Sequence, residues 1–200
     1  MTHPAILILA AGSAARMRGA DKLLELVQGQ PLLRRQAQLA LSLTPHVIVT
    51  HRIPDPDRLA ALHGLTLHLV AVPDAKEGMA ASLRAGAAKA MALNARGLMI
   101  LPADMPDLTR DDLARLIAAF DQDFENIHRA AAADGRPGHP VLLPRDLIPE
   151  LSQLTGDGGA KSLLARHRAR IRLHPLPDDH ALTDLDTPED WAAWRALRGE

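Results

Sequence analysis

The chain has 200 residues, of which 47% are hydrophobic and 24% are charged, and its formal net charge is −1. Such a chain can bury one substantial core, and we expect a single domain over residues 1–200. The balanced charge provides no global field, so neither nucleic acid nor a membrane surface is expected as a partner. The absence of cysteine excludes disulfides, thiolate catalysis and thiolate metal sites. It is compatible with a reducing compartment, and we expect a cytoplasmic protein.

Apolar runs of strand length alternate along the chain with segments of helical periodicity. The expected strands are Ala5–Leu9, His46–Val49, Leu65–Val70, Gly97–Leu101 and Val141–Leu143. The expected helices are Leu32–Leu43, Asp55–His63, Gly78–Leu93 and Thr109–Phe120. Met1–Ala11 is too short to span a bilayer and is expected to form a buried first strand. This alternation predicts an α/β fold, a doubly wound, mostly parallel sheet with helices on both faces. Ile127–Leu143, with glycine and proline in its middle, is expected to be an excursion from the sheet.

The segment after the first strand, Leu9–Leu24, has the composition of an anion-binding loop. Its small residues leave the backbone N–H groups accessible to phosphate oxygens. The guanidinium of Arg16 can donate two parallel hydrogen bonds to a phosphate, and the ammonium group of Lys22 adds a positive charge. The expected nucleotide-binding residues here are Leu9, Ala10, Ala11, Gly12, Ser13 and Lys22. A Walker loop or a dinucleotide fingerprint is disfavoured, because the next glycine after Gly12 is Gly19.

A candidate metal ligand follows the fourth expected strand. Asp104 comes directly after the apolar run Gly97–Leu101, and Pro106 fixes the direction of the chain. A carboxylate at such a strand end can hold Mg²⁺ against nucleotide phosphates. The alternative is an aspartate that only caps a helix or turn. Because Arg16 and Lys22 occur in the same chain, we favour the metal-binding interpretation.

A later acidic segment, Thr183–Trp191, combines a helix start with two further carboxylates. Thr187 is expected to cap a helix that has Pro188 at its first position. Asp184 and Asp186 precede the cap, in a short strand or loop where their side chains would point the same way. A structural role for either residue remains an alternative.

Two stretches are candidates for substrate contacts. Lys76–Gly86 places Gly78, Met79 and Ser82 at a helix start, where unpaired N–H groups favour a pyrimidine carbonyl or a phosphate. The alternative is a helix that starts at glycine and buries Met79 in the core. His139, held between Gly138 and Pro140, is expected near the cleft, although a lone histidine often only packs. The remaining histidines have no zinc-ligand spacing.

The Leu9–Leu24 segment resembles the N-terminal signature of nucleotidyltransferases of the molybdenum cofactor type, roughly LA[AG]GxxxRMGxxK. The chain departs from this pattern by placing Arg18 between Met17 and Gly19. The Asp104–Met105–Pro106 sequence matches the metal-binding strand end of that family. The stretches Gly135–Leu143 and Gly156–Lys161 resemble the acceptor side of molybdopterin cytidylyltransferases. The resemblance extends from Ile6 to Trp191.

The resemblance implies a Rossmann-like nucleotidyltransferase that uses Mg²⁺ to join CMP from CTP to the terminal phosphate of molybdopterin, or molybdenum cofactor, with release of pyrophosphate. Arg16, Lys22 and Asp104 would be the catalytic residues. Asp104 and a late acidic residue, Asp184 or else Asp186, would hold the metal. Gly78, Met79, Ser82 and His139 would contact the substrates, and a molybdoenzyme of the xanthine oxidase type would be a partner.

The preference for CTP rests on Ala11, because cytidylyl members of the family carry LAAG where guanylyl members carry LAGG. The Gly138–Leu143 stretch supports the same choice. The alternatives are a guanylyltransferase for the same cofactor, a transferase for a sugar or polyol phosphate, and a non-catalytic nucleotide-binding chaperone that delivers the cofactor. The presence of Lys22 and Asp104 argues for catalysis.

Overall fold

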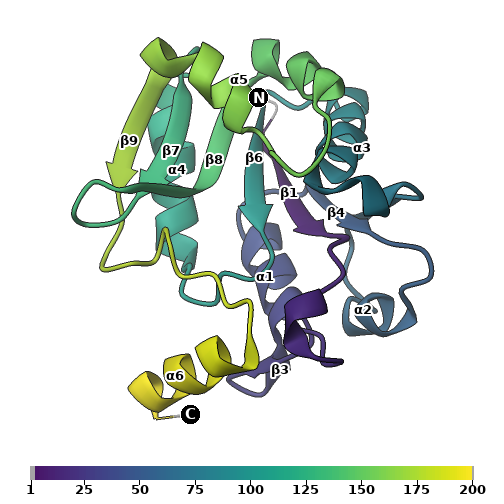
Figure 1. Ribbon diagram of the computed structural model, residues 1–200. Coiled ribbons are helices and arrows are strands. Elements are labelled where there is room, and N and C mark those ends of the chain that lie inside the picture. Colours follow the sequence, from purple (N-terminus) through teal and green to yellow (C-terminus); the bar gives the residue numbers. More distant parts are fainter. Residues whose placement is uncertain (1–2, 200) are drawn as a thin grey trace.

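The computed structural model describes residues 3–199 and shows an α/β fold (Figure 1). Its strands are β1 (Ala5–Ala10), β2 (Leu26–Val27), β3 (Gln30–Pro31), β4 (Val47–His51), β5 (His68–Ala71), β6 (Gly97–Pro102), β7 (Ile127–Ala131), β8 (Pro137–Pro144) and β9 (Ile171–Pro175). Its α-helices are α1 (Leu32–Leu41), α2 (Pro56–Ala61), α3 (Met79–Ala92), α4 (Arg110–Gln122), α5 (Lys161–Arg166) and α6 (Pro188–Arg198). Short 3₁₀ segments occupy Ala15–Met17, Ala75–Glu77, Arg145–Gln153 and Arg168–Arg170.

Within residues 3–199 the main sheet has seven strands in the order β5-β4-β1-β6-β8-β7-β9. β8 runs antiparallel to both of its neighbours, and the other pairings are parallel. The predicted doubly wound, mostly parallel sheet is therefore confirmed. Strand alternation sends Ile6 and Ile8 to one face of β1 and Leu7 to the other, and both faces are buried.

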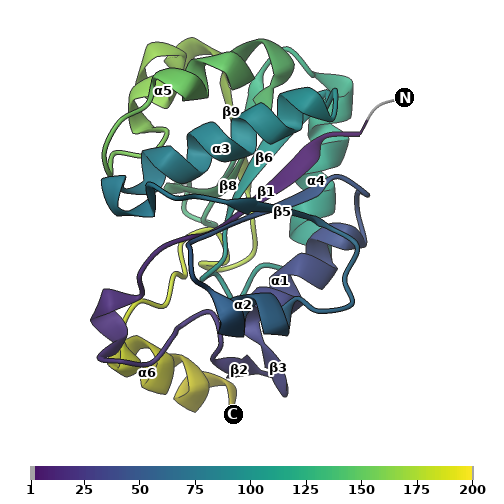
Figure 2. The same cartoon turned by 90° about the vertical axis from the view of Figure 1, so that its right-hand side faces the viewer.

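Helices cover both faces of the sheet, as predicted (Figure 2). One face packs against α1 and α4, through residues such as Leu33 and Leu113. The other face packs against α3, α5 and the Arg145–Gln153 segment, through residues such as Leu83 and Leu163. Among residues 3–199 no helix is both long and apolar enough to cross a bilayer.

Threonine caps the helix at the two expected starts, Thr109 and Thr187. The hydroxyl of Thr109 accepts from the N–H of Asp112, and the carboxylate of Asp112 accepts from the N–H of Thr109. Thr187 and Asp190 form the same reciprocal pair at the start of α6. Such a capping box satisfies N–H groups that have no partner inside the helix. Helix α6 packs against the loop that follows β1, and its Trp191 and Trp194 share a buried cluster with Met17 and Leu32.

The expectation that Ile127–Leu143 leaves the sheet is wrong. Residues 127–131 form β7 and residues 137–144 form β8, and the two strands pair directly. Only the turn between them, with Gly135, projects from the sheet. Polar residues such as His128 and Arg129 hid the strand pattern of β7. The expected strand over Leu65–Val70 begins later, at His68.

Candidate active site

The loop after β1 passes through a tight 3₁₀ segment, Ala15–Met17, between two left-handed residues, Ala14 with φ 51° and Arg18 with φ 52°. The family pattern places glycine at the position of Arg18, and the left-handed backbone there explains that preference. Gly12 has open space where a Cβ would stand. A ligand can therefore approach the backbone of this loop closely.

A buried arginine supports the same loop from behind. Arg58 on α2 is only 1% exposed, and its guanidinium donates to the carbonyl oxygens of Ala10 at 2.7 Å and Gly12 at 2.8 Å. It also forms a two-point contact with the carboxylate of Asp21 at 2.7 and 2.9 Å. This set of bonds ties both ends of the loop to one side chain.

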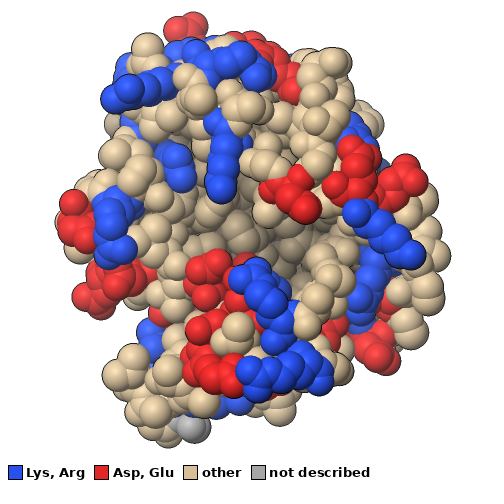
Figure 3. Space-filling model, viewed as in Figure 1, with Lys and Arg blue, Asp and Glu red and all other residues tan. Residues whose placement is uncertain are grey.

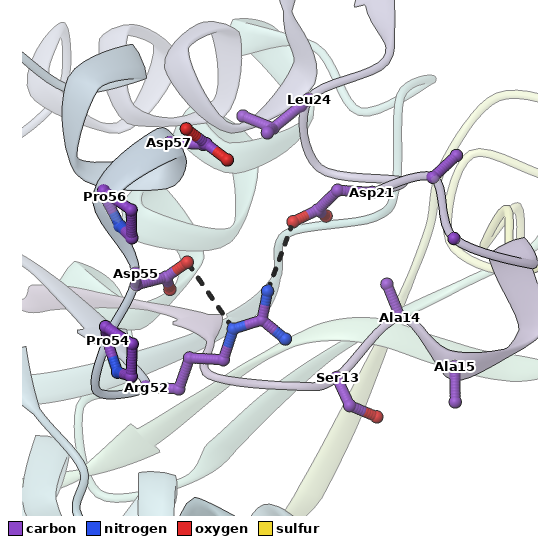
Figure 4. Close-up of a pocket in the computed structure, with 12 residues that line it drawn as sticks. Ser13, Ala14, Ala15, Asp21, Leu24, Arg52, Pro54, Asp55, Pro56 and Asp57 are labelled. Atoms are coloured by element: carbon purple, nitrogen blue, oxygen red, sulfur yellow. Dashed lines mark ion pairs between the residues drawn. The ribbon is translucent and has the colours of Figure 1, made fainter.

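In the described part of the chain, two cavities adjoin the loop. The smaller one, of about 410 Å³, lies beside Asp21 and Asp55 (Figure 4). Arg52 extends from the segment after β4 and places its guanidinium between the two carboxylates. The ion pairs are loose, at 3.8 Å to Asp21 and 3.6 Å to Asp55. Arg52 therefore helps to balance the negative charge behind the loop.

Lys22 connects the loop to two distant acidic residues. Its ammonium group donates to Asp104, which follows β6, and to Asp186 at 2.6 Å. Arg16 forms a further ion pair with Asp186 at 2.7 Å. Burial by itself would lower the pKa of Lys22, but the attraction of Asp104 and Asp186 outweighs burial and raises it. Lys22 is therefore held as a cation between two carboxylates.

Backbone hydrogen bonds fix the position of the late acidic segment. The N–H of Leu185 donates to the carbonyl oxygen of Asp104 at 3.1 Å, and the N–H of Asp186 donates to the carboxylate of Asp190 at 3.1 Å. The pKa of Asp184 is raised, first by desolvation of its carboxylate and then by the charges of Asp104 and Asp186. Negative charge is thus concentrated around Lys22. No set of three or more His, Asp or Glu side chains in residues 3–199 is grouped to hold a metal ion without a ligand's help.

A cavity of about 750 Å³ opens between the loop, the start of α3 and the end of β6. Figure 3 shows the hollow on this face, with basic and acidic side chains around its rim. The predicted residues that line the cavity are Leu9, Ala11, Gly12, Ser13, Arg16, Lys22, Gly78, Met79, Ser82 and Asp104. Asp186 lines it as well, whereas Ala10 is fully buried and neither Asp184 nor His139 contributes to the lining. Of the two late aspartates, Asp186 is the one that faces the cavity.

The start of α3 contributes an open helix end to this cavity. Met79 is 45% exposed, so the alternative that buries it in the core does not apply. Gly78 has φ 110°, and a Cβ there would lie 2.0 Å from a carboxylate oxygen of Asp157. The carboxylate of Asp157 therefore sits against the helix end, at the cavity wall.

His139 lies partly buried at the start of β8. Its backbone N–H donates to the carbonyl oxygen of Ala181 at 2.8 Å, and a Cβ on Gly138 would lie 2.0 Å from that same oxygen. Burial lowers the pKa of His139 to about 4; the charge of Arg129 acts in the same direction and that of Asp104 opposes it. Its Nδ1 atom is buried and has no hydrogen-bond partner among residues 3–199.

The sequence patterns did not single out Arg58 or Arg52 as parts of the site, and they included Asp157 only within the Gly156–Lys161 stretch. Arg58 and Arg52 flank a predicted helix start, where charged residues normally face solvent. Asp157 stands in a glycine-rich stretch, and only its closeness to Gly78 places it at the cavity. A signal for Arg58 was available: a charged residue inside a helix that packs on a buried sheet needs a partner.

Comparison with known proteins agrees with this geometry. A model of the MobA-like NTP transferase domain matches residues 6–171. The chain is 30% identical to the purine catabolism protein PucB of Bacillus subtilis, over 92% of this chain and 91% of that protein. It is 35% identical to a molybdenum cofactor guanylyltransferase of Burkholderia vietnamiensis, over 81% of this chain and 82% of that protein.

A solved structure has the same arrangement. The manganese complex of Rv0371c from Mycobacterium tuberculosis superposes with a TM-score of 0.78 at 26% identity, covering 96% of this chain and 97% of that one. The chain thus belongs to the MobA-like NTP transferase family, and it is a nucleotidyltransferase.

Proposed function

We propose that this enzyme transfers CMP from CTP to the terminal phosphate of molybdopterin, or of the molybdenum cofactor, and releases pyrophosphate. The observation that carries the proposal is the position of Lys22, between Asp104 and Asp186 at the wall of the cavity. This arrangement places cations beside carboxylates where a nucleoside triphosphate meets its acceptor. Molybdenum cofactor as the acceptor is supported by the name of the Burkholderia relative.

The acidic residues fit a divalent cation. Asp104 and Asp186 both line the cavity and both contact Lys22, so two carboxylates lie close together at its wall. Mg²⁺ is normally held by one or two carboxylates together with phosphate oxygens and water. Asp104 would hold it with Asp186 or Asp184, and the manganese complex of the mycobacterial relative supports a divalent ion. When bound, the ion would neutralise phosphate charge.

The transfer itself needs positioning more than proton movement. An oxygen of the acceptor phosphate attacks the α-phosphorus and forms the new P–O bond, while the bond between the α-phosphorus and the bridging oxygen breaks. Pyrophosphate leaves with the electron pair of that bond. Arg16 and Lys22 offset the charge that develops on the leaving group. The acceptor phosphate is largely ionised near neutral pH, so no general base is required.

CTP is proposed because Ala11 narrows the cavity where guanylyl members of the family have glycine. Ala11 is 5% exposed and lines the cavity, so its methyl group takes space that a larger base would need. GTP is the second candidate, since the relative from Burkholderia vietnamiensis is named a guanylyltransferase. We further propose that the domain spans residues 1–200, that it acts in the cytoplasm, and that a molybdoenzyme of the xanthine oxidase type receives the product.

The nucleotide is tested by the ratio of kcat/KM for CTP and GTP, with molybdenum cofactor as the acceptor. We expect the parent to prefer CTP. Ala11→Gly should shift the ratio toward GTP by roughly 10- to 200-fold, which is the change in selectivity that one added or missing carbon group in a binding pocket produces. Ala85→Gly, at a half-buried position on α3, is the control for a general effect of losing a methyl group. A parent that uses GTP better than CTP would reject the cytidylyl assignment and leave the guanylyl one.

A further inference from the structure

Arg129 on β7 is a half-buried cation without a carboxylate partner in the described part of the chain. Its Nε donates to the carbonyl oxygen of Gly138 at 2.9 Å, and one Nη contacts that of Pro137 at 3.4 Å. Its other Nη has no hydrogen-bond partner among residues 3–199. Many arginines of this chain pair with Asp or Glu, so an arginine that is neither paired nor fully solvated needs another explanation.

The register of the sheet directs Arg129 toward the candidate site. Arg129 pairs with Val141 of β8, and Val141 pairs in turn with Ile100 of β6. From that level the guanidinium reaches along β8 to Gly138. Because β8 is antiparallel to β6, this is the direction in which β6 continues to Asp104. The charged end of Arg129 thus lies toward the edge of the sheet that carries Asp104.

His139 supports the same placement. The charge of Arg129 lowers its pKa and that of Asp104 raises it, so both charges act on this ring. Along the sheet the order is β1, β6, β8, β7. The triphosphate loop follows β1, Asp104 follows β6, His139 begins β8, and Arg129 extends from β7. Arg129 is therefore separated from the loop by the candidate reaction centre.

In-line transfer requires this separation, because the attacking oxygen and the leaving pyrophosphate lie on opposite sides of the α-phosphorus. The loop with Arg16 and Lys22 serves the leaving side. We propose that Arg129 binds the terminal phosphate of the acceptor, a phosphate monoester, on the attacking side. This inference rests on the proposed function for the identity of the acceptor, but not for the presence of an anion site at Arg129.

The surroundings of Arg129 suit a dianionic group. The exposed edge of the guanidinium can give two parallel hydrogen bonds to a phosphate, as arginine does elsewhere. The neighbouring His139 is neutral at pH 7, because burial keeps its pKa near 4, so the histidine adds no charge. Arg129 is then the residue that determines how tightly this end of the site holds an anion.

Binding of inorganic phosphate and of glycerol phosphate tests the inference without any pterin. The full-length protein is first saturated with a non-hydrolysable nucleoside triphosphate analogue, and phosphate affinity is then measured by calorimetry. We expect Arg129→Gln to weaken phosphate binding by about 10- to 100-fold, the range for one charge-assisted bidentate contact. Arg129→Lys should retain part of the affinity. Affinity for the triphosphate analogue should stay within about threefold.

Arg172→Gln is the matched control, because Arg172 lies on the adjacent strand β9, is exposed, and pairs loosely with Asp123 at 3.8 Å. Circular dichroism melting of each variant shows whether it folds. Unchanged phosphate affinity in a folded Arg129→Gln protein would overturn the inference. Equal losses in Arg129→Gln and Arg172→Gln, or phosphate that competes with the triphosphate analogue, would overturn it too.

Kinetics separate this inference from the proposed function. With molybdenum cofactor as the acceptor, Arg129→Gln should raise the KM for the acceptor and leave the KM for the nucleotide unchanged. A parent that releases no pyrophosphate with this acceptor, yet binds phosphate through Arg129, would reject the proposed acceptor and keep the anion site. A parent that is active with the cofactor while Arg129→Gln retains its acceptor KM would reject the anion site alone.

Discussion

Lys22, in the loop after β1, forms an ion pair with Asp104, which follows β6 and lies 82 residues further along the chain. Both side chains are mostly buried, with 16% and 17% of their surface exposed. The pair joins the two motifs that carry the chemical interpretation of the sequence. A triphosphate that enters the cavity would therefore meet a cation and a carboxylate already held next to each other.

Removing either cation of the loop should slow the reaction. We expect Lys22→Ala and Arg16→Ala to lower kcat by about two to three orders of magnitude, the effect of losing one preorganised charge. Lys22 should show the larger loss, because Arg16 is 69% exposed and its charge is better screened. Steady-state pyrophosphate release measures this.

Arg18→Ala is the control for the two loop variants. Arg18 is 71% exposed and pairs with Glu189 on α6, and it does not line the larger cavity. Its turnover should stay close to that of the parent. If Lys22→Ala and Arg16→Ala both retained turnover within about threefold, the loop would not stabilise the leaving group.

Asp104→Asn should leave the fold intact and abolish metal-dependent turnover. The amide keeps the shape and one acceptor oxygen but removes the charge that a divalent cation needs. The measurement is activity as a function of Mg²⁺ and Mn²⁺ concentration. Asp111→Asn, at an exposed position in the first turn of α4, should keep the metal dependence of the parent. Identical metal dependence in Asp104→Asn and the parent would remove Asp104 from the site.

Arg58 should contribute strongly to stability through the loop that it supports. Arg58→Met removes the buried donor shared by the carboxylate of Asp21 and the carbonyl oxygens of Ala10 and Gly12. Breaking a buried pair of this kind costs about 3–5 kcal/mol. Urea unfolding measures the free energy, and nucleotide affinity should fall as well. Arg52→Met should cost less than about 1 kcal/mol, because its ion pairs are loose, at 3.6 and 3.8 Å, and its own side chain is 37% exposed. Equal losses in both variants would contradict the supporting role of Arg58.

Stability should fall as the pH falls below about 6.5, because of His139. Its pKa is lowered from 6.5 to about 4 by burial in the folded protein, so the unfolded chain takes up this proton first. The contribution of neutral His139 to the free energy of unfolding is fully present above pH 6.5 and is lost as the pH approaches 4. The total loss is roughly 3 kcal/mol at most. His139→Asn should therefore flatten the pH dependence of Tm between pH 7 and 4.5. Burial also lowers the pKa of His174, so part of the slope should remain. The exposed His63→Asn is the control, and a parental slope in His139→Asn would exclude His139 as its source.

The part of the fold that local patterns could predict lies around β1, β4, β6 and their helices. These strands are buried on both faces and therefore form continuous apolar runs, which are recognisable without a structure. Strands β7 and β9 carry His128, Arg129 and Arg172 among their apolar residues, so their pattern is weak. Their pairing depends on contacts far apart in the sequence.

In the candidate site too, local sequence patterns indicate some residues, and only tertiary contacts place the others. That the loop residues and Asp104 line one cavity could be expected, because the loop and Asp104 come after recognisable strands of the same sheet. Which of Asp184 and Asp186 faces the cavity was not predictable, because residues two apart share the same direction in an extended segment. The choice follows from the bond of Leu185 to the distant Asp104 and from the contact of Asp186 with the distant Lys22. The roles of Arg58 and Arg129 also arise only from tertiary contacts.

Pyrophosphate release from each of the four nucleoside triphosphates, with and without molybdenum cofactor, tests the central claim most directly. The account predicts release that requires the cofactor and a divalent cation, is greatest with CTP, and is lost in Asp104→Asn. Mass analysis of the product should show a cytosine dinucleotide form of the cofactor. Release of equal size without the cofactor, or no release with any of the four nucleotides in its presence, would contradict it.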